Sequence, residues 1–229
     1  MRWEVVKELV LFLESSSLDP KNICIVGGSS SDPEVTVLEK HFPSASIFYA
    51  GIDNYGMEKN WIYLDLNSTQ DLIQQFDLLV CSQVLEHVWN ISNVMENLRL
   101  ITKNNGVLWM NCPTSNIPHG SPDYYSAGYS PEFLVNNLQL SEFKCLLSKN
   151  IGSERYYKAT HLLSLWSSEQ EHRYPITGYR FTKPITKGKI LEFLRRIPGR
   201  ILMLSWDSQV TDEIKFATET IYAGIRIEN

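Results

Sequence analysis

Short apolar strands alternate with amphipathic helices over much of this chain, and this alternation constrains the fold most strongly. The first strand is the segment NICIV, which two glycines end, and a helical pattern follows at residues 31–42. Further strand patterns occupy residues 45–53, 61–66, 77–81 and 107–112. Strands that alternate with helices in this way predict a parallel sheet, with right-handed crossovers and helices on both faces.

The chain after this region is less regular. A helical pattern that begins with Ser130 and Pro131 precedes a sixth strand pattern at residues 143–150. Residues 214–228 are rich in β-branched and aromatic residues, as expected of a closing strand. Residues 155–208 combine helical patches with aromatic and basic loops. We expect a single domain over residues 1–229, with 155–208 inserted between the last two strands as a cap over the substrate.

The composition excludes several classes of protein. Hydrophobic residues make up 43% of the chain and charged residues 21%, which is typical of a soluble globular protein. The net charge of −5 argues against a general nucleic-acid binder, because such proteins need a basic surface. The longest apolar run, Leu9–Leu13, is too short to span a bilayer and lies in an amphipathic helical pattern. We therefore expect no integral membrane association.

The cysteines and histidines form no pattern of metal ligands. The four cysteines, at positions 24, 81, 112 and 145, lie inside or beside predicted strands, and no two form a CxxC pair. This placement is expected of reduced core cysteines in a cytoplasmic protein. His161 and His172 have no carboxylates at a spacing that defines a coordination sphere, so we predict no metal site.

Three turns at the carboxyl ends of predicted strands carry small or acidic residues. Gly27, Gly28 and Ser29 follow the first strand, where small residues let a ligand approach the backbone or simply form a tight turn. Asp53 ends the second strand, where a carboxylate suits the two hydroxyls of a ribose or an Asx turn. Asp65 ends the third strand, where it accepts from an adenine amino group or caps the next helix. Together the turns predict a nucleoside-shaped slot at one edge of the sheet.

The segment FDLLVCSQVLEHV, residues 76–88, makes the assignment of this slot more specific. With the helix that follows it and the strand NNGVLWMNCP, it resembles the fourth and fifth strands of class I S-adenosylmethionine-dependent methyltransferases. The segments AGID, YLDLN and ATETIYAGIRI are also similar to this family. The resemblance implies a Rossmann-like, doubly wound α/β sheet of seven strands, mostly parallel with an antiparallel last strand. It also implies S-adenosyl-L-methionine as the cofactor.

The same resemblance implies roles for single residues. The methionine part of the cofactor would lie on the first turn, the ribose on Asp53, and the adenine beside Asp65 and Leu66. The sulfonium and its methyl group would lie beside the polar residues that follow the fourth strand. Glu86 and His87 shape the start of a helix in this family. The residues implied in cofactor binding are therefore Gly27, Gly28, Ser29, Asp53, Asp65, Leu66, Ser82 and Gln83.

Two positions depart from the family pattern. Ile25 stands where the family usually has an acidic residue, and Ser31 stands where a third glycine is usual. A missing acid removes one anchor for the ammonium group of the methionine. The departures motivate a second hypothesis, a degenerate cofactor-binding partner subunit without catalysis. A nicotinamide oxidoreductase is a third hypothesis, and it would need a fuller GxGxxG turn.

The segment PTSNIPHGSPDYYSAGYSPEFL, residues 113–134, supplies candidates for the acceptor site. It resembles a segment of methyltransferases that are common among glycan and surface-polysaccharide enzymes. We expect His119 as the base, because its ordinary pKa of ~6.5 lies near the working pH, and Asp123 as a second catalytic candidate. Each has a simpler interpretation as a residue of the loop structure. The candidate substrate-binding residues are Tyr124, Tyr125, Tyr129 and Arg180. The tyrosines suit stacking on a sugar or packing of the cap. Arg180 suits binding of an acidic glycan or a place on a solvated helix face.

These patterns predict an S-adenosylmethionine-dependent methyltransferase that O-methylates a sugar or another small polar acceptor. Surface-polysaccharide biosynthesis is the expected process. The reaction is an in-line displacement at an activated methyl group, so the protein mainly has to align acceptor, methyl and sulfur. The choice between oxygen and nitrogen as the accepting atom stays open, as does the oligomeric state.

Overall fold

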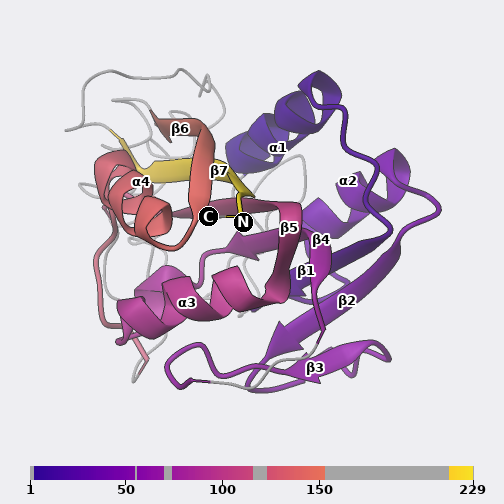
Figure 1. Cartoon of the computed structure of the whole chain (residues 1–229), viewed down its shortest axis with the longest axis horizontal. Helices are drawn as coiled ribbons and strands as arrows, with labels where there is room; N and C mark the ends of the chain where they lie inside the picture. Colours follow the sequence, from indigo (N-terminus) through magenta and orange to yellow (C-terminus); the bar gives the residue numbers. More distant parts are fainter. Residues whose placement is uncertain (1–2, 55, 70–73, 116–122, 153–216, 229) are drawn as a thin grey trace, which may run out of the picture.

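The computed structural model describes residues 3–54, 56–69, 74–115, 123–152 and 217–228 (Figure 1). In these ranges the helices are α1 (Trp3–Ser15), α2 (Pro33–His41), α3 (Ile91–Ile101), α4 (Pro131–Leu140) and the short 3-10 helix η1 (Leu85–His87). The strands are β1 (Asn22–Val26), β2 (Ser46–Gly51), β3 (Trp61–Tyr63), β4 (Phe76–Ser82), β5 (Thr102–Pro113), β6 (Phe143–Ile151) and β7 (Glu219–Arg226).

The strands form one seven-stranded sheet in the order β3-β2-β1-β4-β5-β7-β6. The pairs β3–β2, β2–β1, β1–β4 and β4–β5 are all parallel. Strand β7 runs antiparallel to both of its neighbours, β5 and β6. This arrangement confirms the predicted Rossmann-like, mostly parallel sheet with an antiparallel last strand. The strand order reverses between β1 and β4, and in such sheets ligands bind at the carboxyl ends beside this point.

Helices cover both faces of the sheet, because the side chains of a strand alternate between its two faces. In β1, Ile23 and Ile25 belong to the apolar core under α1 and α2. Cys24 and Val26 belong to the core under α3 and α4. The central strands are therefore apolar on both faces, which explains why they read as continuous hydrophobic runs in the sequence.

Helix α1 has the predicted amphipathic pattern. Val5 and Leu9 are fully buried against the sheet, and the ring of Phe12 lies 5.3 Å from the ring of Trp109 in β5. The apolar face of α1 thus contributes to the core. In the part of the chain that the structure describes, no helix has the length and apolar character needed to cross a membrane.

Asp77 fixes the start of β4. Its carboxylate accepts hydrogen bonds from the backbone N–H groups of Lys21 and Asn22, at 3.0 and 2.8 Å, and from Nζ of Lys103 at 2.7 Å. Partial burial opposes its ionisation, but these donors outweigh burial and lower the pKa of Asp77. The aspartate that begins this strand in the sequence pattern therefore serves to join β1, β4 and the start of β5.

Two local predictions were wrong. The sequence predicted the fifth strand at residues 107–112, but β5 already begins at Thr102, which pairs with Phe76. The register then shifts before the next pair, and Asn105 rather than Gly106 adopts a positive φ, of 61°. The second error concerns Cys145, which lies exposed on β6 because this strand is at the edge of the sheet.

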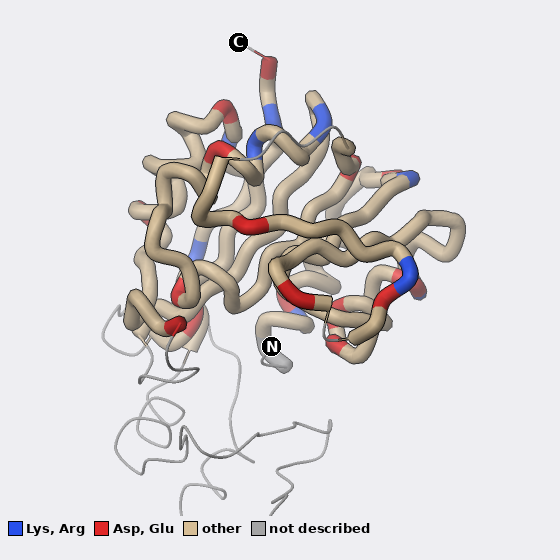
Figure 2. Tube along the Cα trace, turned by 90° about the horizontal axis from the view of Figure 1, so that it is seen from below, with Lys and Arg blue, Asp and Glu red and all other residues tan. Residues whose placement is uncertain are grey.

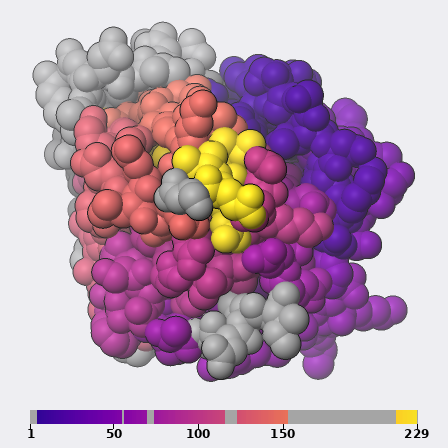
Figure 3. All heavy atoms as spheres, in the orientation of Figure 1, coloured from indigo at the N-terminus to yellow at the C-terminus, as the bar shows by residue number. Residues whose placement is uncertain are grey.

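The predicted cap, residues 155–208, lies outside the described residues and stays a prediction. Chain order places it between β6 and β7. Figure 2 shows acidic and basic residues interspersed along the described trace. Figure 3 shows the end of β7 between the α4–β6 region and the α3 region, where the backbone N–H of Ile227 donates to the carbonyl of Glu142 at 2.9 Å.

Candidate functional site

A cavity of about 490 Å³ lies at the carboxyl ends of β1, β2, β3 and β4. It contains the residues that follow each of these strands, which are the positions where the sequence predicted a slot. The predicted site residues that line it are Gly27, Gly28, Ser29, Asp53, Asp65, Leu66, Gln83, Asp123 and Tyr125. Its size falls within the range of about 300–1,000 Å³ that is usual for small-molecule sites.

The turn after β1 needs small residues. Gly27 has a φ of +74°, and a Cβ atom at this position would lie 2.5 Å from Cγ2 of Val84. A Cβ atom on Gly28 would lie 2.7 Å from Cγ2 of Ile25 and 2.9 Å from Oδ2 of Asp32. The two glycines therefore let the backbone lie close to its neighbours at the cavity wall, as a cradle for a ligand requires.

Asp32 organises this turn in a way that the sequence did not indicate. Asp32 stands at the N-cap position of α2, but its side chain makes no capping hydrogen bond to the helix. Instead Oδ2 of Asp32 accepts from the backbone N–H of Ser29 at 2.6 Å. The N–H of Ser30 donates to Oε1 of Glu58 at 2.8 Å. Two carboxylates therefore hold the turn that lacks a third glycine.

Asp53 and Asp65 face the same cavity from neighbouring strands. Asp65 accepts from the backbone N–H of Asn67 at 2.9 Å and from the hydroxyl of Ser68 at 3.0 Å. These are the contacts of an Asx turn over residues 65–68. Leu66 is buried and adds an apolar part to the wall.

The two polar residues after β4 have different surroundings. Gln83 lines the cavity with a φ of +56°, and its backbone N–H donates to the carbonyl of Asn111 at 2.9 Å. Its Nε2 donates to Oε2 of Glu219 at 2.7 Å. The hydroxyl of Ser82 is buried near the carboxyl group of Glu34 in α2, where it acts to lower the pKa of that acid. Ser82 does not line the cavity.

His87 connects η1 to the segment that starts at Asp123. Its Nδ1 lies 2.5 Å from the carbonyl oxygen of Asp123, so this nitrogen carries the proton and donates. The N–H of Tyr125 donates to the carbonyl of Glu86 at 2.8 Å. The ring of Tyr124 meets the ring of His87 edge-on, with centroids 6.4 Å apart. His87 thus positions the acceptor-side segment against the cavity.

The predicted acceptor-side residues divide between the cavity and the core. Asp123 and the half-exposed Tyr125 line the cavity, and Tyr124 and Tyr129 do not. Tyr129 stacks on Phe133 of α4 with ring centroids 4.8 Å apart, so its ring packs on that helix. The predictions for His119 and Arg180 fall on positions outside the described residues.

Glu34, in the first turn of α2, is a buried acid that sequence reasoning missed. It is only 3% exposed, and its Oε2 makes no hydrogen bond within the described part of the chain. Burial raises the pKa of Glu34, and the negative charge of Asp32 adds to the effect, although its own backbone N–H and Ser82 act in the opposite direction. Glutamate is common in the first turn of a helix, so the burial of Glu34 could not be read from the residue type and its position.

Replacing Glu34 by glutamine should stabilise the protein at neutral pH. A raised pKa means that ionised Glu34 disfavours the folded state once the pH exceeds the ordinary value of ~4.3. The Glu34→Gln variant should therefore have a thermal midpoint a few degrees above that of the wild type at pH 7.5, and the same midpoint at pH 4. Thermal unfolding across this range measures the difference. Equal destabilisation by Glu34→Gln at both pH values would contradict this prediction. Glu39→Gln, an exposed change on the same helix, is the control.

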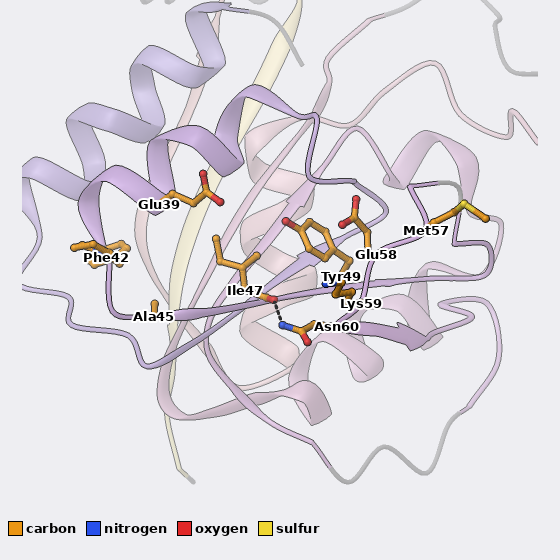
Figure 4. Close-up of a pocket in the computed structure, with 10 residues that line it drawn as sticks. Glu39, Phe42, Ala45, Ile47, Tyr49, Met57, Glu58, Lys59 and Asn60 are labelled. Atoms are coloured by element: carbon orange, nitrogen blue, oxygen red, sulfur yellow. Dashed lines mark hydrogen bonds between the residues drawn. The ribbon is translucent and has the colours of Figure 1, made fainter.

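No cluster of metal ligands occurs within the described ranges, where no three His, Cys, Asp or Glu side chains come together. Burial raises the pKa of Cys24, Cys81 and Cys112, so these thiols stay protonated at neutral pH. A second hollow, of about 520 Å³, lies between the end of α2, strand β2 and residues 57–60 before β3 (Figure 4). None of the predicted site residues lines it.

Sequence comparison and structure comparison gave different results. No family model matches the chain, and a search of curated proteins found no match. Solved structures are similar to it at very low sequence identity, so they bear on the fold alone. NodS, an N-methyltransferase from Bradyrhizobium japonicum WM9 in complex with S-adenosyl-L-homocysteine, has a TM-score of 0.52 and 10% identity, over 96% of this chain and 85% of NodS.

Two further structures align over 97% of this chain. Coclaurine N-methyltransferase, bound to N-methylheliamine and S-adenosylhomocysteine, has a TM-score of 0.58 and 8% identity over 72% of its own length. The [4+2]-cyclase SpnF has a TM-score of 0.55 and 13% identity over 82% of its length. Two of these proteins are N-methyltransferases and the third is a cyclase, so the shared architecture by itself does not specify one reaction.

Proposed function

We propose that this chain, which has the fold of class I S-adenosylmethionine-dependent methyltransferases, binds S-adenosyl-L-methionine in the cavity and methylates a small polar acceptor. The observation that supports this most directly is the convergence of Gly27, Asp53, Asp65 and Gln83 on one cavity at the strand-order reversal. NodS and coclaurine N-methyltransferase, which are similar in fold, were solved with S-adenosylhomocysteine.

The residues of the cavity fit the parts of this cofactor. The close-packed turn at Gly27 and Gly28 suits its methionine part. Asp53 suits the two ribose hydroxyls, because a carboxylate only accepts hydrogen bonds. Asp65 keeps a polar edge toward the adenine, and Leu66 gives an apolar surface beside it. Gln83 lies where the reactive end would be.

The chain's own contribution to catalysis is alignment. The cofactor, when bound, supplies a methyl group that positive sulfur has already activated. The protein has to hold this methyl in line with the accepting atom, and such positioning alone lowers a barrier by several kcal/mol. His87 and the backbone of Glu86 hold the segment with Asp123 and Tyr125 at the open side of the cavity. This segment therefore provides the wall on which the acceptor would lie.

The acceptor class is the finer part of the proposal. A sugar hydroxyl, which the Asp-Tyr-Tyr segment favours, needs a base to take its proton, with His119 as the predicted base and Asp123 as the second candidate. An amine is the alternative, since the two methyltransferases named above act on nitrogen. A neutral amine attacks without prior loss of a proton. Surface-polysaccharide biosynthesis and a cytoplasmic location stay predictions.

Titration calorimetry with S-adenosylmethionine, S-adenosylhomocysteine and NAD tests the proposal. We expect the first two ligands to bind and NAD not to bind. Binding of none would favour the second hypothesis, a partner subunit without catalysis, and binding of NAD alone would favour an oxidoreductase. Mass spectrometry of pooled sugar nucleotides and small amines, incubated with protein and cofactor, then identifies the acceptor by a gain of one CH₂.

A further inference from the structure

A buried hydrogen-bonded group links three strands behind the reactive end of the cavity. Glu219, the first residue of β7, is fully buried. Its Oε2 accepts from Nε2 of Gln83 at 2.7 Å and from Nδ2 of Asn111 at 3.5 Å. Gln83 is also held by its backbone N–H, which donates to the carbonyl of Asn111. The side chain and the main chain of Gln83 are thus both tied to neighbouring strands.

The backbone of Gln83 is itself unusual. Its φ of +56° lies in the left-handed region, which glutamine seldom adopts and which costs about 1 kcal/mol or more. Glycine would relieve this cost but would remove the side chain. Backbone strain of this kind persists at positions where the surrounding structure holds a functional group in place.

The partner of Gln83 determines how its amide is oriented. The NH₂ group of Gln83 faces Glu219, because Nε2 donates to the carboxyl oxygen Oε2. The carbonyl oxygen Oε1 then points away from Glu219, and it accepts no hydrogen bond from the described residues. Since Gln83 lines the cavity, this oxygen is the polar atom that the residue can offer to a ligand.

We propose that Glu219 is a positioning residue that orients the amide of Gln83, so that the carbonyl oxygen of this amide favours a cationic ligand at this end of the cavity. The inference rests on the proposed function, in which this end receives the sulfonium. A fixed dipole and charge in a buried site interact more strongly than they do in water. The site would therefore discriminate between the cationic cofactor and its neutral product, S-adenosylhomocysteine.

This discrimination has a use in the reaction cycle. After methyl transfer the sulfur is a neutral thioether, and the attraction to the carbonyl oxygen of Gln83 is lost. The product then binds less tightly than the substrate by the amount of that attraction. The pair would thus reduce product inhibition without taking part in bond formation.

The test is a ratio of dissociation constants, measured by calorimetry at pH 7.5. The probes are S-adenosylmethionine, S-adenosylhomocysteine and sinefungin, in which a protonated amine replaces the methylsulfonium. Wild-type protein should bind both cationic ligands more tightly than the neutral one. In Glu219→Gln the preference should fall by about tenfold, with the affinity for S-adenosylhomocysteine nearly unchanged, because a glutamine at 219 both donates and accepts and no longer fixes the amide.

Gln83→Met keeps the length of the side chain and removes the amide, so it should lose the same preference even if the first variant folds poorly. Glu39→Gln, an exposed change on α2, is the matched control and should keep the wild-type ratio. An unchanged ratio in both site variants, or an equal loss for all three ligands, would overturn the proposal. A wild-type protein that binds none of the ligands would instead reject the proposed function itself.

Discussion

Replacing Asp53 by alanine should weaken the binding of S-adenosylhomocysteine by about 100-fold. A hydrogen bond to a charged group contributes about 1.5–3 kcal/mol, and a ribose offers two hydroxyls to this carboxylate. The loss of both bonds corresponds to at least about 3 kcal/mol, which is a factor of roughly 100 in affinity. Calorimetry with the purified variant measures this loss directly. Asp53 lies on the cavity wall just beyond β2, so its removal changes no core packing.

The control for this prediction is Asp19→Ala. Asp19 is an exposed aspartate in the loop before β1, where it pairs with Lys21 on the surface, and it does not line the cavity. This variant should bind as the wild type does. A second ligand, 5′-methylthioadenosine, has the ribose but not the amino-acid part. Its affinity for the Asp53→Ala variant should fall by a similar factor. Unchanged affinity for both ligands in a folded variant would show that the ribose lies elsewhere.

Replacing Trp109 by alanine should cause the largest loss of stability. Trp109 is fully buried in β5, and its ring packs on Phe12 of α1 at a centroid distance of 5.3 Å. Truncating a buried tryptophan costs about 3–5 kcal/mol, and each kcal/mol moves the midpoint of a domain of this size by about 2–4 °C. We therefore expect the thermal midpoint to fall by about 10 °C in differential scanning calorimetry.

Two further variants separate the packing effect from the loss of an aromatic ring. Trp109→Phe keeps most of the contact with Phe12, so its thermal midpoint should fall much less than that of Trp109→Ala. Trp89→Ala removes a tryptophan that is 63% exposed, and its midpoint should stay within about 1 °C of the wild type. A midpoint for Trp109→Ala close to that of Trp89→Ala would mean that α1 does not pack on the sheet as described.

Local patterns in the sequence predicted most of the architecture. The apolar runs of β1, β4 and β5 are continuous because both faces of these strands are covered. The Ser-Pro pair before α4 was a reliable start signal, since the Ser130 hydroxyl accepts from the N–H of Phe133. One local signal failed because of a distant residue. Strand β5 begins at Thr102, which pairs with Phe76, ahead of the predicted start of this strand at residue 107.

The candidate site also contains residues that local patterns indicate and residues that they do not. The turn at Gly27 and the acid at Asp53 were visible in the sequence, because their position at the end of a strand is a local property. The buried acids Glu34 and Glu219 were not visible. Burial of a carboxylate depends on which elements pack against it, and Gln83 and Glu219 are separated by 136 positions along the chain. No local period relates two such residues.

The sequence by itself therefore determined the order and type of the elements and the edge of the sheet where a ligand would lie. Hydrophobic periodicity and turn chemistry act between near neighbours, so they can be read along the chain. Only the tertiary structure decided which polar groups meet at that edge and which of them are buried. The antiparallel return of β7 beside β5 brings Glu219 to Gln83, and this contact orients the amide of Gln83 at the cavity wall.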